Sequence, residues 1–128
     1  MIKILKSSLM VLMFGGFFSQ TAVAQDAGAA LKTIADIVAS INHFPSDTDK
    51  AALAEIEANA NLPQGVRNMA NTVANISHAA SAEGKDQMAA IQANAQAPDF
   101  AKALAGIIAG INHVPSDEAK ATLAELFP

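Results

Sequence analysis

The chain has 128 residues, of which 52% are hydrophobic, with a formal net charge of −4 and no cysteine. This length fits one domain, and the acidic balance argues against nucleic acid or anionic lipid as a partner. Without cysteine, the fold has to be stabilised by packing rather than by disulfides.

The first 24 residues have the pattern of a secretory signal peptide. Lys3 and Lys6 precede an apolar run, and small residues at Ala22 and Ala24 follow it. This pattern predicts cleavage after Ala24, which removes residues 1–24 and leaves a single domain of residues 25–128 with a net charge of −6. The apolar run is shorter than the roughly 20 residues that a bilayer span needs. We therefore expect a secreted or periplasmic protein with no stable membrane span after cleavage.

The remaining sequence predicts an all-α fold of about six short helices. Leu31, Ile34 and Val38 are spaced as on one face of a helix, and Pro45 disfavours helix at the residue before it. Ser46 can then cap the next helix. The same pattern continues along the chain and predicts helices at 27–42, 48–60, 64–79, 84–95, 98–112 and 117–126. In the middle unit, Ala80 stands where the other two units have Pro45 and Pro115. The helix at 64–79 is therefore expected to be a turn longer than its counterparts.

The helices fall into three similar units of 35 residues each. Residues 32–56 match residues 102–126 at 15 of 25 positions without a gap. The three units, 28–62, 63–97 and 98–128, indicate a helical hairpin repeated three times. A short α-solenoid and a compact six-helix bundle are both compatible with this periodicity.

Three histidines, His43, His78 and His113, occupy one position of the repeat. Three imidazoles are a ligand set for a transition metal. In an open solenoid they would stand on the order of 10 Å apart, given usual helix spacings, so a shared ion requires a closed, pseudo-three-fold arrangement. The alternative is a capping role, in which each histidine bonds the carbonyls at a helix C-terminus and interacts with the helix dipole.

The sequence predicts no catalytic residue. Ser46 and Asp47 follow His43 too closely to be assumed to form a nucleophilic set with it, and helix capping explains both residues. The segment also lacks the strand, turn and helix that usually present a catalytic serine. We therefore expect a protein that is not an enzyme.

Gly106 and Gly110 lie four residues apart within the predicted helix 98–112. Each glycine costs about 1 kcal/mol relative to alanine inside a helix, so a compensating contact is expected. Small residues at this spacing allow a second helix to approach closely. The second helix would come from the same chain or from a partner subunit, which would make a homodimer through residues 98–112.

Two functions follow from these patterns as hypotheses. The first is a secreted, non-enzymatic helical-repeat protein without a cofactor, which binds or scaffolds a protein or peptide partner on an extended surface. The alternative is a metal-binding or haem-binding periplasmic protein that uses His43, His78 and His113. The distances between the three histidines distinguish these hypotheses.

Overall fold

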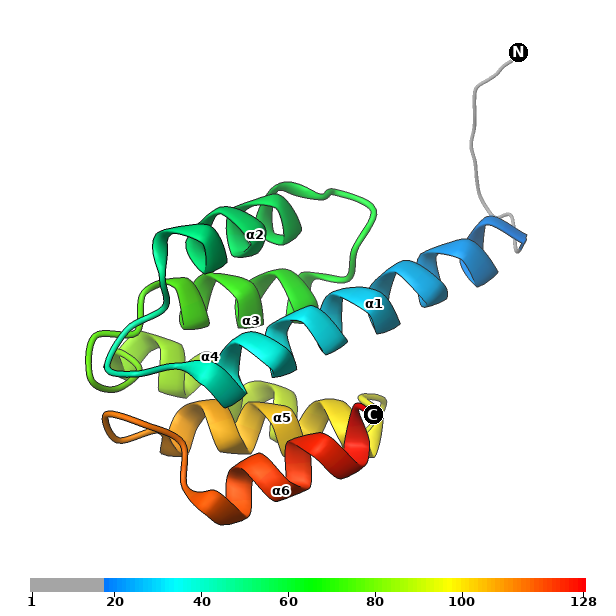
Figure 1. The fold of residues 1–128 in the computed structure, drawn as a ribbon. Coiled ribbons are helices and arrows are strands. Elements are labelled where there is room, and N and C mark those ends of the chain that lie inside the picture. The colour runs from blue at the N-terminus through cyan, green and yellow to red at the C-terminus, as the bar shows by residue number, and fades with distance from the viewer. Residues whose placement is uncertain (1–17) are drawn as a thin grey trace.

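The computed structural model describes residues 18–128, which form six α-helices and no β-strand (Figure 1). The predicted all-α class is confirmed. In chain order the helices are α1 (Phe18–Ser40), α2 (Asp47–Ala58), α3 (Gln64–Ala74), α4 (Ala82–Ala93), α5 (Asp99–Gly110) and α6 (Asp117–Leu126). None of these helices is long and apolar enough to cross a membrane. Most of the predicted signal peptide, residues 1–17, lies outside the described residues.

The starts of α2 and α6 follow the predicted capping chemistry, and α4 begins in the same way at Ser81. The hydroxyl oxygens of Ser46, Ser81 and Ser116 accept hydrogen bonds from the backbone N–H three residues ahead, at 3.1, 3.0 and 3.0 Å. Each bond satisfies one of the backbone donors that the first turn of a helix leaves without a partner. The three outer helices α2, α4 and α6 therefore begin in the same way.

The end of α3 differs from the prediction. This helix ends at Ala74, five residues before the expected boundary at residue 79. The backbone of Ile76 leaves the helix while its side chain stays buried at 2% exposure, and His78 then takes a positive φ of 72°. The chain therefore turns here without the proline, with the same left-handed conformation that His43 and His113 adopt before Pro45 and Pro115.

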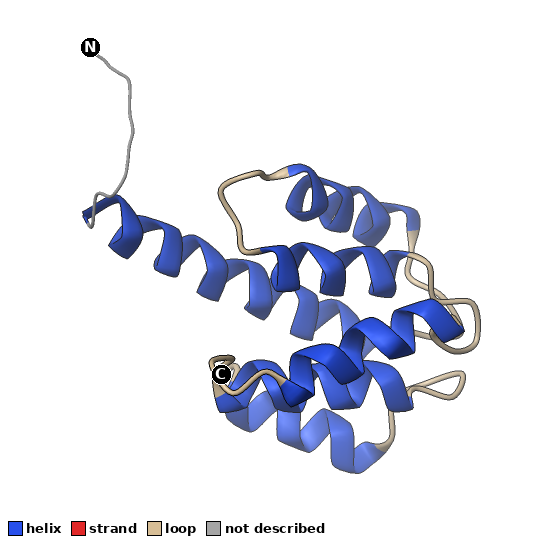
Figure 2. Cartoon of the chain, turned by 180° about the vertical axis from the view of Figure 1, so that it is seen from behind, coloured by secondary structure: helices blue, strands red, loops and turns tan. Residues whose placement is uncertain are grey.

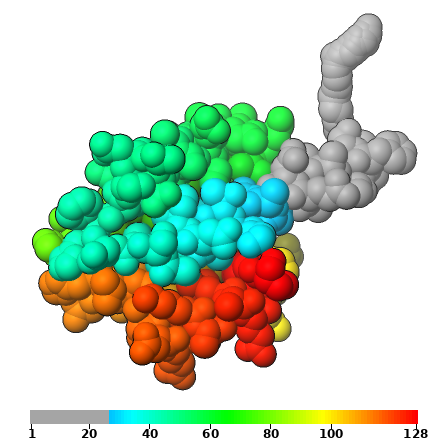
Figure 3. Space-filling model, in the orientation of Figure 1, coloured from blue at the N-terminus to red at the C-terminus, as the bar shows by residue number. Residues whose placement is uncertain are grey.

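The six helices form a closed ring rather than an open array. Helices α1, α3 and α5 contact one another in the middle, while α2 packs on α3, α4 packs on α5, and α6 returns to α1 (Figures 1 and 2). Lys32 Nζ reaches the carbonyl oxygen of Phe127 at 3.4 Å, as Arg67 Nε reaches that of Glu57 at 3.0 Å. In the space-filling view, the orange and red C-terminal atoms lie directly against the cyan atoms of α1 (Figure 3).

The core lies where the three inner helices meet. Residues at equivalent positions, 35 apart, are buried together, which places the same face of each inner helix toward the centre. Alanine occupies one of these positions in all three helices, and its small side chain allows the helices to approach closely. The equivalent sets are Ile34, Met69 and Leu104; Ala35, Ala70 and Ala105; Val38, Val73 and Ile108; and, from the outer helices, Leu53, Met88 and Leu123.

The two glycines of α5 have different surroundings. A Cβ atom on Gly106 would lie 2.7 Å from Nε2 of the Gln92 side chain of α4. Gly110 is exposed, and a Cβ atom there would meet nothing within 4 Å. Gly106 is therefore half-buried beside a side chain of α4, and homodimerisation through residues 98–112 stays a prediction.

Gly84 marks a tight contact between α4 and α3. A Cβ atom at this position would lie 2.8 Å from Thr72 Cγ2, and Thr72 is a stiff, β-branched residue that is only 2% exposed. We expect Gly84→Ala to lower the free energy of unfolding by about 1 kcal/mol, because overpacking exceeds the gain in helix propensity. Urea denaturation measures this change. Gly110→Ala, which meets nothing, is the matched control, and a Gly84→Ala protein as stable as the wild type would contradict the prediction.

Candidate metal centre

The three histidines lie in three equivalent turns, each directly after the end of an inner helix. A buried isoleucine anchors each turn at Ile41, Ile76 or Ile111. The histidine two residues later has a positive φ, which is 74° at His43 and 72° at both His78 and His113. Histidine is one of the few non-glycine residues enriched in this left-handed region, but the conformation still costs roughly 1–2 kcal/mol per residue. The three turns lie at one end of the molecule (Figure 1).

A cyclic set of backbone hydrogen bonds joins the three turns. The N–H of His43 donates to the carbonyl oxygen of His113 at 2.6 Å, and the N–H of His78 donates to that of His43 at 2.6 Å. The N–H of His113 completes the cycle by donating to the carbonyl oxygen of His78 at 2.5 Å. This cycle holds the three backbones around one axis and so brings the three side chains together.

The imidazole rings are close enough to bind one ion. Their centroids are 5.2 Å apart for His43 and His78, 5.1 Å for His43 and His113, and 4.9 Å for His78 and His113. Around a tetrahedral zinc ion with Zn–N distances of about 2.0–2.1 Å, three imidazole centroids would lie about 5 Å apart. The ring spacing therefore matches that of a three-histidine zinc site.

The nitrogen atoms need only a small adjustment to reach a bound ion. One ligand nitrogen from each ring lies within 4.8 Å of the other two, whereas nitrogens on a tetrahedral zinc ion are about 3.4 Å apart. Each nitrogen has to move toward the centre by less than about 1 Å to meet the zinc–nitrogen distance. Rotation about χ2, which is a soft torsion in histidine, provides this movement.

Two asparagine side chains orient two of the rings. The Nδ1 atom of His43 lies 2.6 Å from Asn42 Oδ1, and that of His113 lies 2.7 Å from Asn112 Oδ1. A carbonyl oxygen can only accept, so each contact is a hydrogen bond in the tautomer that has the proton on Nδ1. The lone pair of Nε2 is then available for a metal, in the manner of the outer-shell partners of metal-bound histidines. Ser77 precedes His78, so that ring lacks the amide partner of the other two.

The electrostatics of the three turns favour a cation. Helices α1, α3 and α5 all end just before the histidines, and a helix C-terminus carries partial negative charge. The last turns of these three helices contain no Lys or Arg that would neutralise this charge. The cluster also lies at the surface, since His78 and His113 are exposed and His43 is half-buried. An ion from solution therefore reaches the cluster without any rearrangement of the core.

These observations bear on both interpretations of the histidines. The three histidines converge on one point. The sequence is compatible with this convergence only if the helices form a closed arrangement. The capping interpretation expected the rings to bond helix carbonyls, but the rings of His43 and His113 contact asparagine side chains instead. Sequence reasoning missed the role of Asn42 and Asn112, although both asparagines directly precede the histidines in the most similar units.

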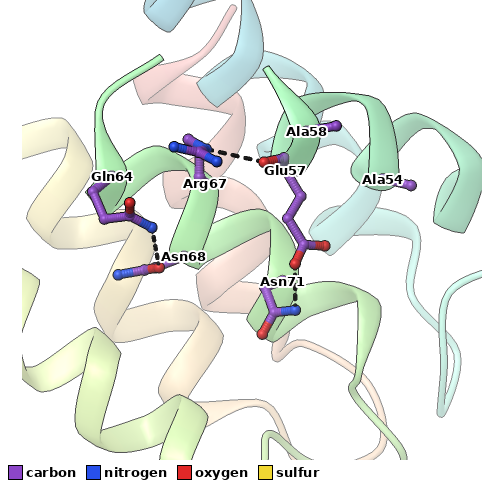
Figure 4. Close-up of a pocket in the computed structure, with 7 residues that line it drawn as sticks. All are labelled: Ala54, Glu57, Ala58, Gln64, Arg67, Asn68 and Asn71. Atoms are coloured by element: carbon purple, nitrogen blue, oxygen red, sulfur yellow. Dashed lines mark hydrogen bonds between the residues drawn. The ribbon is translucent and has the colours of Figure 1, made fainter. Parts of the chain in front are cut away.

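A second, polar groove lies between α2 and α3 (Figure 4). Arg67 and Asn71 both contact Glu57, through its carbonyl oxygen and its carboxylate respectively, and Gln64 Nε2 donates to Asn68 Oδ1 at 2.9 Å. The contacts to Glu57 join the two helices, whereas the pair of Gln64 and Asn68 lies within α3. The groove therefore joins two helices and holds no set of side chains aimed at one point, unlike the histidine cluster.

The histidine cluster thus combines three convergent imidazoles, asparagine partners for two of them and the C-termini of three helices. Comparison with known proteins found no matching family model, no matching curated protein and no matching solved structure.

Proposed function

We propose that this protein binds a single divalent transition-metal ion, zinc or copper, through His43, His78 and His113. The observation that carries the proposal is the convergence of the three rings, whose ligand nitrogens lie within 4.8 Å of one another. Imidazole nitrogen is a good ligand for both metals. With the predicted signal peptide removed, such a protein would act outside the cytoplasm, where it would store, buffer or deliver the ion.

The backbone conformation of the three histidines supports a functional role. A left-handed conformation is adopted most cheaply by glycine, yet each turn has histidine there. Strained residues of this kind persist where the surrounding structure enforces them, and they cluster at functional sites. If the turns served only to end the helices, glycine would do so at lower cost. We infer that the imidazole side chain is the reason for histidine at this position.

The same geometry supports an ion in preference to haem. Haem iron takes its axial ligands on opposite faces of a wide, flat ring system, so three imidazoles that converge from one side supply at most one such ligand. The closed ring of helices also gives less support to a scaffold. The binding surfaces of helical repeats are concave faces of an open array, and here α6 returns to α1.

Metal titration of the purified protein tests the proposal. We expect one zinc or copper ion per chain, measured by competition with a chromogenic chelator, and loss of that binding in the H43A/H78A/H113A variant. A second variant, H43N/H78N/H113N, controls for folding, because asparagine also tolerates a positive φ but is a poor zinc ligand. Binding by the wild type that persists in both folded variants, or no binding by the wild type, would overturn the proposal.

The asparagine partners provide a finer test. We expect Asn112→Ala to weaken zinc binding about 10-fold, because loss of an outer-shell hydrogen bond typically costs 10-fold to 100-fold in metal affinity. The control is Ser77→Ala at the equivalent position of the middle unit, where no amide orients the ring. Equal losses in the two variants, measured by the same competition titration, would show that the Asn112 contact does not orient His113.

A further inference from the structure

We infer that the metal ion bound by His43, His78 and His113 keeps a coordination position open to solvent, and that this position takes a small monodentate anion. The inference rests on the proposed metal binding and goes beyond it, because it specifies what else the ion binds. A closed, structural zinc site has four protein ligands, whereas a site with three keeps a position for water or another small ligand.

Among residues 27–128, whose side chains the structure describes, the cluster offers three protein ligands: the group that converges there consists of the three histidines and includes no carboxylate. The residues that follow the histidines are Phe44, Ala79 and Val114, which have no metal-binding atom in their side chains. Two of the residues that precede the histidines, Asn42 and Asn112, already contact the Nδ1 atoms through their side-chain oxygens.

The open position faces outward. His78 and His113 are exposed and His43 is half-buried, so the cluster is at the surface. The cyclic bonds join the backbones of the three histidines, and a buried isoleucine, at Ile41, Ile76 or Ile111, anchors each turn to the core. The fourth ligand of a tetrahedral ion has to come from the side opposite the three imidazoles, which here is solvent. Water fills this position first, and a small anion displaces it without disturbing the three histidines.

Cobalt substitution tests this inference with a probe that reports its own coordination. Cobalt(II) is loaded into the wild-type protein, and its visible absorption bands are followed while sodium azide is added. We expect the bands to shift with a saturable dependence on azide, while one cobalt ion per chain stays bound. Cobalt in the H43N/H78N/H113N variant, or free in buffer, is the control and should not show this saturable shift.

The outcomes separate the two proposals. No cobalt binding would overturn metal binding itself, and the open position with it. Cobalt bound through the three histidines with bands that azide leaves unchanged would overturn only the open position. Sedimentation velocity adds a second readout. One ion per monomer agrees with an open position, whereas one ion shared by two chains would overturn it, because a second copy would then fill the position.

Discussion

Replacing Leu104 by alanine is expected to lower the free energy of unfolding by about 3 kcal/mol, within the roughly 2–5 kcal/mol typical of buried leucines. Leu104 is fully buried on the inner helix α5, at the position equivalent to Ile34 and Met69 of the other two inner helices. Its removal leaves a cavity where three helices meet, and each helix is fixed by its partners on both sides. Collapse into the cavity would require all three helices to move.

The loss would be a large fraction of the stability of this domain, since small domains unfold with about 5–15 kcal/mol. Urea denaturation measures it as a lower midpoint with an unchanged slope. The matched control is Leu126→Ala, which removes the same atoms from a residue that is 37% exposed and should cost far less. Similar losses in the two variants would show that the centre of the ring is not the main source of stability.

Zinc is expected to stabilise the protein strongly if it binds at the histidine cluster. At a free concentration one hundred times its Kd, a ligand that binds only the folded state adds about 2.7 kcal/mol to the free energy of unfolding. For a domain of this size, this corresponds to a rise in melting temperature of roughly 10 °C or more. The physical reason is that His43, His78 and His113 converge only in the folded ring, whereas the unfolded chain separates them by 35 residues at each step.

Calorimetry of the wild type and of H43N/H78N/H113N, each with and without zinc, measures this effect. The variant should melt at the same temperature in both conditions. An equal rise in the variant would assign the stabilisation to zinc bound elsewhere on the acidic surface, and the prediction would then be wrong. An increase in wild-type stability that grows with the logarithm of zinc concentration is the signature of linkage to a single site.

Much of the local structure could be predicted from the sequence, because its causes are local. The apolar spacing seen at Leu31, Ile34 and Val38 defines one face of a helix, and Ser46 and Ser116 cap the helices that follow them. These effects act over three or four residues. The end of α3 was predicted wrongly because the proline was used as the signal that ends an inner helix, whereas α3 ends without one and leads into the same positive-φ turn as α1 and α5.

From the sequence, the convergence of the three histidines could be predicted only for a closed arrangement of the helices. The 35-residue spacing of His43, His78 and His113 identified them as one equivalent set, but the same spacing fits an open array with distant histidines and a closed ring with adjacent ones. The contacts of Asn42 and Asn112 also depend on the turn that each pair of residues adopts, which apolar periodicity does not describe.

The sequence by itself determined the all-helical fold, the serine caps of α2 and α6 and the equivalence of the three turns, because each follows from chemistry within a few residues or from the repeat. Only the tertiary structure decided that α6 packs on α1 and that the backbones of His43, His78 and His113 bond in a cycle. Both features join residues that are 35 or more positions apart, and they depend on the angles at which helices pack. These packing angles bring three repeated histidines together in one candidate metal centre.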